Sequence, residues 1–167
     1  MVMNQGPAAF ERGHDHEQCM RRAIDAAVDH CRREGARLTP LRRKVLQALW
    51  QSHEPLGAYE ICEVLGAHGD SVLPPTVYRA LDFLQNQSLV HRIPSLNAYI
   101  GCNQPGPHHD GRYLICSDCG LVAELPADDL MVRFEDEAAG LRFEARSVRL
   151  EAVGRCGSCA GTKRDAP

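Results

Sequence analysis

Two pairs of cysteines, each with the spacing CxxC, constrain this chain more than any other feature. The first pair is Cys116 and Cys119, and the second is Cys156 and Cys159. Four thiolates are the number that a closed tetrahedral zinc site needs, and the glycines beside both pairs suit the tight turns that aim paired sulfurs at one ion. A redox CxxC motif would not need the second pair. We therefore expect a structural zinc site.

The 36 residues between the two pairs make a longer loop than an ordinary zinc ribbon has. This loop contains the pattern of a helix followed by a strand, so the ion would staple a strand, a helix and another strand together. Zinc binding of this kind counts as folding free energy for a domain that is too small to be secure alone.

The cysteine count and the start of the chain bear on its redox compartment. Eight cysteines in 167 residues would also fit a secreted disulfide scaffold. The chain begins without an apolar signal segment, however, and has no apolar stretch of roughly 18 residues, the length that spans a bilayer. We expect a cytoplasmic protein in which Cys19, Cys31 and Cys62 are buried, reduced thiols.

The composition, 44% hydrophobic and 25% charged, is that of a soluble globular protein. The formal net charge of −3 argues mildly against nucleic-acid binding. Residues 1–97 carry 11 basic and 11 acidic side chains, whereas residues 98–167 carry 8 and 11. Any DNA affinity must therefore come from local clusters such as Arg42-Arg43-Lys44, and not from the global field.

The N-terminal part predicts a winged helix. Apolar residues recur at helical spacing in three segments, and a fourth helix begins at a Pro-Pro-Thr sequence and carries a narrow apolar stripe. Two extended runs follow and are joined by a turn-forming segment, as in a β-hairpin. The expected helices cover residues 20–35, 39–53, 58–67 and a segment from Pro74 to about Asn86, and the extended runs cover residues 89–93 and 98–102.

The C-terminal part has the shorter β-rich runs of a small α/β domain, so the fold class is α+β. A wing and a domain hinge cannot be separated by pattern between Ile93 and Tyr99. The expected strands cover residues 113–116, 121–125 and 142–152, with a helix over residues 128–139. The expected organisation is a tail over residues 1–16, a winged-helix DNA-binding domain over 17–97, a metal-binding dimerisation domain over 98–160, and a tail over 161–167.

One run of sequence carries a family resemblance. The segment PPTVYRALDFL from Pro74 to Leu84, preceded by RLTPLR from Arg37 to Arg42 and followed by the CxxC pairs, resembles the ferric uptake regulator family. The resemblance covers about residues 18–160 and is closest to the zinc uptake regulator branch. It implies a structural zinc on the four cysteines of the two pairs, and a homodimer that binds inverted DNA half-sites.

The resemblance also implies a second, regulatory zinc ion. Its ligands would be His91, Cys102, His109 and Glu124. Spacing alone predicts this site only weakly, because a histidine in a strand, a cysteine at a strand end and a half-exposed glutamate usually bind no metal. His108 lies next to His109, and a small shift of the loop would exchange the two as ligand.

The ligand types favour zinc at this second site. A cysteine beside imidazole ligands suits Zn²⁺ better than Fe²⁺ or Mn²⁺, although the affinity order does not exclude Co²⁺ or Ni²⁺. We therefore expect a zinc-sensing transcriptional repressor of zinc-uptake genes, in which zinc, as corepressor, fixes the dimer in a DNA-binding geometry. An iron-responsive or peroxide-sensing regulator of the same family is the main alternative.

The fourth helix would supply the base contacts. Its outer face carries Arg79, which could form a bidentate pair with guanine. The resemblance adds a tyrosine at the start of the third helix, and arginines near the second helix are plausible phosphate contacts. The residues expected to contact DNA are Arg79, Tyr59, Arg42, Arg37, Thr76 and Tyr78.

Two other classes of function fit less well. A zinc hydrolase would need an open metal position for water, and four protein ligands would close the second site, so we expect no enzyme, no catalytic residues and no small-molecule substrate. A zinc-stapled interaction module would be favoured if DNA binding were absent at every zinc level.

Overall fold

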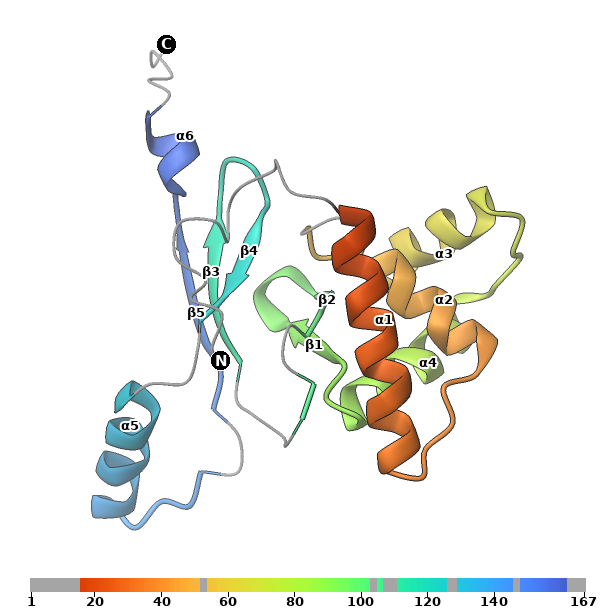
Figure 1. Cartoon of the computed structure of the whole chain (residues 1–167). Coiled ribbons are helices and arrows are strands. Elements are labelled where there is room, and N and C mark those ends of the chain that lie inside the picture. Colours follow the sequence, from red (N-terminus) through yellow and green to blue (C-terminus); the bar gives the residue numbers. More distant parts are fainter. Residues whose placement is uncertain are drawn as a thin grey trace. The chain divides into compact units, whose positions relative to one another are not determined.

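The computed structural model describes residues 16–51, 54–102, 105–106, 111–125, 129–145 and 148–161 (Figure 1). These residues form two compact units, of which the first ends before residue 110 and the second begins there. The tails expected at residues 1–16 and 161–167 lie almost wholly outside the described residues. Within the described ranges, no helix has the length and apolar character needed to cross a membrane.

Among the described residues, the first unit comprises four α-helices and a hairpin, which lie together in Figure 1. The helices are α1 (His16–Arg33), α2 (Pro40–Leu49), α3 (Ala58–Ala67) and α4 (Pro74–Asn86). The hairpin consists of β1 (Val90–Ile93) and β2 (Ala98–Gly101), joined by the short helix η2 (Pro94–Leu96). This arrangement is the predicted winged helix.

Local signals set where α2 begins and ends. Thr39 caps the helix by accepting a hydrogen bond from the Arg42 N–H, and Pro40 occupies the first position, where a missing N–H costs nothing. The helix ends at Leu49, before the expected end near residue 53. Trp50 is the C-cap residue, its N–H bonds the carbonyls of Leu46 and Gln47, and its side chain is buried with the indole against Gly101.

The core of the first unit lies between the helices and the hairpin. The stripe predicted on α4, formed by Val77, Leu81 and Leu84, is completely buried. In the hairpin, Val90 pairs with Gly101 and Ile93 with Ala98 in antiparallel register. The whole cluster is sealed by apolar side chains of α1, α2 and α3, so the outer face of α4 is positioned by a rigid packed body.

In the part of the second unit that the structure describes, there is a three-stranded sheet with two helices. Its elements are β3 (Arg112–Cys116), β4 (Val122–Glu124), α5 (Asp129–Gly140), β5 (Leu150–Gly154) and α6 (Gly157–Gly161). The central strand β3 pairs antiparallel with β4 and parallel with β5. The α+β class is confirmed.

The last strand departs from the prediction. A strand was expected over residues 142–152, but β5 begins only at Leu150. The helix α5 ends instead in a tight turn, in which Arg142 adopts a φ of 58° and the Phe143 N–H bonds the carbonyl of Ala138. The residues that read as the start of a strand are therefore the C-terminal cap of α5.

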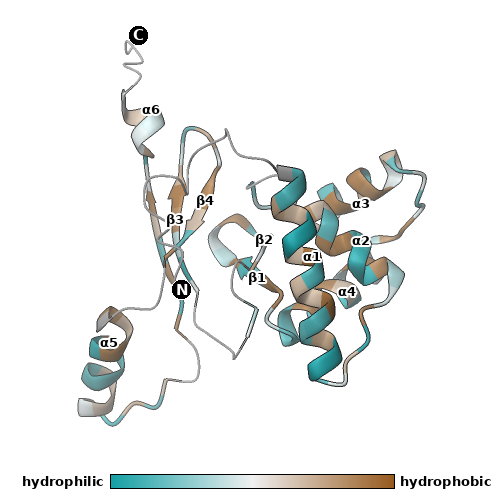
Figure 2. Ribbon diagram, in the orientation of Figure 1, coloured by the Kyte–Doolittle hydropathy of each residue, from teal (hydrophilic) through white to brown (hydrophobic). Residues whose placement is uncertain are grey.

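The second unit leaves apolar side chains exposed. Polar and apolar residues both line α5 (Figure 2), and Val153 of β5 is also exposed. The exposed apolar residues on and after α5 are Leu130, Val132, Phe134, Leu141 and Phe143. An unpartnered set of this kind is typical of a surface that another protein chain covers.

Candidate metal sites and DNA-facing helix

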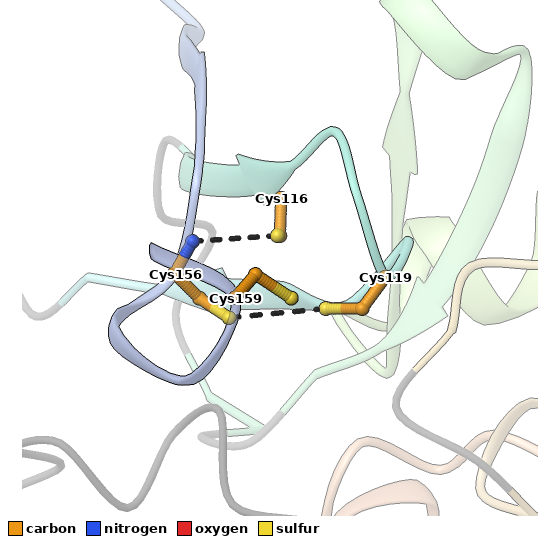
Figure 3. A group of neighbouring side chains, drawn as sticks. All are labelled: Cys116, Cys119, Cys156 and Cys159. Atoms are coloured by element: carbon orange, nitrogen blue, oxygen red, sulfur yellow. Dashed lines mark hydrogen bonds between the residues drawn. The ribbon is translucent and has the colours of Figure 1, made fainter. Parts of the chain in front are cut away.

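The parallel pairing of β3 with β5 brings the two CxxC pairs together. Cys116 is the last residue of β3 and lies opposite Gly154, two residues before Cys156. Cys119 follows in the turn after β3, and Cys159 lies in α6. Figure 3 shows the four side chains converging from these segments, and all four sulfur atoms lie within 4.8 Å of one another.

The spacing of the sulfurs fits one tetrahedral ion. Four ligands at the usual Zn–S distance of about 2.3 Å place their sulfurs about 3.8 Å apart. The Sγ atoms of Cys119 and Cys156 are 3.9 Å apart. In addition, the Cys156 N–H donates to the Sγ of Cys116 at 3.3 Å, an interaction that stabilises a thiolate. The donor set and the geometry therefore suit zinc.

Without an ion, these thiols do not all ionise near neutral pH. The backbone N–H of Cys156 lowers the pKa of the Cys116 thiol to about 6. Hydrogen bonding with Cys156, followed by burial, raises the pKa of the Cys159 thiol to about 12. A dication can hold four thiolates at this spacing, and its binding must release protons.

Polar contacts hold the two cysteine turns in place. The Arg155 Nε donates to Asp118 Oδ2 at 2.7 Å, and the same guanidinium donates to the carbonyl of Cys159 at 2.6 Å. The Ser117 N–H bonds the carbonyl of Gly154 at 2.8 Å. The first turn is thus tied to the second by Ser117, Asp118 and Arg155, which the sequence analysis did not single out. These residues could have been found from their positions, which lie inside or next to the CxxC pairs.

The hairpin of the first unit carries two of the four ligands expected at the second metal site. His91 lies in β1 opposite Ile100, and Cys102 follows β2, where its N–H bonds the carbonyl of Leu89. Residues 100 and 102 point to the same face of the strand, so His91 and Cys102 are diagonal neighbours. A ring nitrogen of His91 and the sulfur of Cys102 lie within 4.8 Å of each other.

The other two expected ligands belong elsewhere. Glu124 is the last residue of β4 in the second unit, where it pairs with Tyr113 and is half-buried. His109 and its neighbour His108 lie outside the described residues. The structure thus brings two of the four expected ligands together within one unit, and the complete set stays a prediction.

The helix α4 exposes the side chains expected to contact DNA. Thr76, Tyr78 and Arg79 all face away from the buried stripe. At the start of α3, the Tyr59 side chain is 67% exposed. Arg37 is likewise exposed, in the loop before α2. All five side chains are therefore accessible to a ligand of the first unit.

Arg42 is held differently from the other expected contacts. Its guanidinium lies 3.5 Å from the centre of the Phe83 ring and donates to the carbonyl of Arg37 at 2.7 Å. These contacts tie α2 to α4 and fix the loop that carries Arg37. A second tie, in which Lys44 pairs with Asp70 at 2.6 Å, holds the loop before α4. The spacing of Lys44 and Asp70 in the sequence gave no signal for that pair.

The fold and the cysteine site together define a class: a winged helix followed by a small α+β unit whose four cysteines are placed to bind one metal ion. Residues 33–153 match the model of the ferric uptake regulator family. The chain belongs to this family.

Individual relatives agree with this assignment. The chain is 36% identical over 130 residues to the zinc uptake regulation protein of Escherichia coli (strain K12), covering 77% of this chain and 76% of that protein. A solved zinc uptake regulator complexed with zinc and DNA has a TM-score of 0.81 at 34% identity, covering 85% of this chain and 95% of that chain. The structure of holo XcZur has a TM-score of 0.77 at 36% identity, covering 83% and 97%.

Proposed function

We propose that this chain is a cytoplasmic, zinc-sensing repressor of zinc-uptake genes, with zinc as corepressor. The observation that carries the proposal is a winged helix whose α4 exposes Arg79, in a chain 36% identical to a zinc uptake regulation protein. A solved relative with 34% identity was determined with zinc and DNA, which supports both ligands for this chain.

Two zinc ions per subunit would serve two purposes. The first would bind Cys116, Cys119, Cys156 and Cys159 and hold the second unit together, as the sulfur spacing supports. The second would be the sensor ion. Its ligands would be His91, Cys102, His109 and Glu124, a mixed nitrogen, sulfur and oxygen set that zinc accepts.

The sensor ion would act by joining the two compact units. His91 and Cys102 belong to the first unit and Glu124 to the second. An ion bound by residues of both would fix the angle between the units and select the dimer geometry in which both α4 helices reach DNA. A coupling of roughly 1–3 kcal/mol would then tighten DNA binding about 5- to 150-fold.

The division of labour follows the predicted domains. Residues 17–97 would bind DNA and also supply His91 as a metal ligand, and residues 98–160 would supply the other metal ligands and dimerise. The apolar side chains exposed on α5, together with Val153, support a two-fold interface between copies of the second unit. Two copies of α4 would then read inverted half-sites, with Arg79 on guanine and Tyr59, Thr76 and Tyr78 on bases or backbone.

The experiment that tests this function is a DNA-binding titration. Purified full-length protein is mixed with an operator of a zinc-uptake gene from its source organism at controlled free Zn²⁺, Fe²⁺ or Mn²⁺. We expect binding that requires zinc and that Cys102→Ser loses while keeping one zinc per chain. Cys62→Ser, which changes another thiol of the first unit, should bind as the wild type does.

Each other outcome has a definite meaning. Binding that follows iron would move the chain to the iron-responsive branch, and binding that peroxide abolishes would make it a peroxide sensor. DNA binding absent at every zinc level would leave a zinc-stapled interaction module. Binding that ignores metal would contradict the sensor site.

A further inference from the structure

The first helical positions of α4 offer few backbone hydrogen-bond donors. Pro74 and Pro75 occupy its first two positions and have no N–H group. The next two amides, of Thr76 and Val77, both bond the carbonyl of Leu73, at 2.9 and 3.3 Å. Of the four helical positions from Pro74 to Val77, two therefore have no N–H group to present to an anion and two have an N–H group that is already bonded.

Exposed apolar side chains lie at this end of the helix instead of free N–H groups. Leu73 is the N-cap residue, makes no side-chain cap and is 72% exposed. Pro75 is also exposed and precedes Arg79 by four residues, so the two share the outer face of the helix. The outer face of α4 thus begins with an apolar surface and continues with a guanidinium group.

Base edges restrict what such a surface can recognise. The major groove presents hydrogen-bond donors and acceptors at every base pair, and its apolar feature is the C5 methyl group of thymine. Recognition helices contact base edges through their N-terminal residues. An exposed leucine alone would need no explanation, but at this position it replaces the polar contacts that the helix terminus has lost.

We propose that Leu73 is a specificity-determining residue that packs on the C5 methyl group of a thymine in each half-site, with Pro75 beside it. This inference rests on the proposed function. Leu73 selects thymine beyond the base that Arg79 reads, and it accepts 5-methylcytosine in place of thymine better than it accepts unmethylated cytosine.

The test removes single methyl groups from the DNA. Zinc-loaded full-length protein first selects a duplex from a random-sequence library, and each thymine of the selected half-site is then replaced by deoxyuridine in turn. One replacement should weaken binding about fourfold, as expected for one buried methyl group. In Leu73→Ala the unsubstituted duplex should bind more weakly, and the same deoxyuridine should cost nothing further.

Two variants make the result specific to Leu73. Leu73→Met retains the hydrocarbon and should keep the fourfold penalty, whereas Leu96→Ala trims another exposed leucine of the same unit and should leave the penalty unchanged. An equal penalty in wild type and Leu73→Ala would overturn the inference, as would a half-site in which no thymine is sensitive. Failure of the wild type to select any duplex would instead overturn the proposed function, and the inference with it.

Discussion

The two units of this chain are stabilised in different ways. In the first, apolar side chains of four helices and a hairpin form one continuous buried cluster. In the second, fewer of the described side chains are buried, Cys116 and Cys156 are among them, and α5 exposes Leu130, Val132 and Phe134. Apolar packing can therefore stabilise the first unit, whereas we expect the second to be stabilised by an ion on its four cysteines and by a second copy of the chain.

Removal of zinc from the four cysteines should produce the largest difference in stability between the two units. Cys156→Ser leaves three thiolates, and structural zinc sites contribute about 10–16 kcal/mol of binding free energy in zinc-finger peptides. We expect residues 111–161 to lose hydrogen-exchange protection while α1 to α4 keep theirs. The control is Cys19→Ser, which should retain the zinc. If both units lost protection together, the contrast would be wrong.

A substitution that disturbs packing in the first unit should destabilise that unit, and by a smaller free energy. A Cβ atom at Gly101 would collide with the indole Nε1 of Trp50, so Gly101→Ala should lower the free energy of unfolding by about 1–3 kcal/mol. Thermal unfolding of the zinc-loaded protein measures this change. Gly66→Ala, in α3, meets no atom within 4 Å and should leave stability unchanged or slightly higher.

The zinc content of Gly101→Ala then sharpens the comparison. We expect the zinc on the four cysteines to remain in place, because these thiols belong to the other unit. Loss of that zinc from a folded Gly101→Ala protein would show that the two units are not independently stabilised.

Loss of the polar contacts around the cysteine turns should have a modest effect on the rate of zinc release. Arg155 joins Asp118 to the carbonyl of Cys159, but the pair is partly exposed, with side-chain exposures of 44% and 23%. Solvent screening limits such a pair to at most about 1 kcal/mol. Arg155→Ala should therefore release zinc to a chelator only about two- to fivefold faster, followed with a colorimetric zinc indicator. Arg149→Ala is the matched control, and equal release rates in both variants would deny Arg155 this role.

The smallest expected effect is a difference in reactivity between two thiols of the first unit. Burial raises the pKa of the Cys31 thiol, which lowers its thiolate fraction at any given pH. Cys19, on the same helix, is only half-buried. Alkylation of the folded, zinc-loaded protein at pH 8, read by peptide mass spectrometry, should label Cys19 before Cys31. The reverse order would show that α1 does not pack as described.

The sequence predicted the parts of this structure that local rules determine. The bounds of α3 and the start of α4 follow from apolar spacing and from the prolines, and the cysteine site follows from two short motifs. The strand β5 was misplaced because its side chains are mostly exposed and show no alternation. Its parallel pairing with β3 depends on a contact between distant segments, which no local pattern encodes.

The candidate sensor site also has a part that local patterns determine. The diagonal contact of His91 with Cys102 follows from the register of one hairpin, which pattern analysis placed within a residue or two. The exposed position of Leu73 could not be predicted from the sequence, because a single leucine before two prolines carries no motif. Only its exposure at the N-cap of α4 distinguishes it from a core residue.

The parallel pairing of β3 with β5 also sets an order of events during synthesis. All elements of the first unit precede β3, so that unit can fold while the ribosome is still translating the second. The strand β3 must wait for β5, and the first cysteine pair must wait for the second. The newly made chain therefore passes through a stage in which the winged helix is complete but Cys156 and Cys159 have not yet been made, and Cys116 and Cys119 are open to oxidation or to a competing metal until α6 emerges.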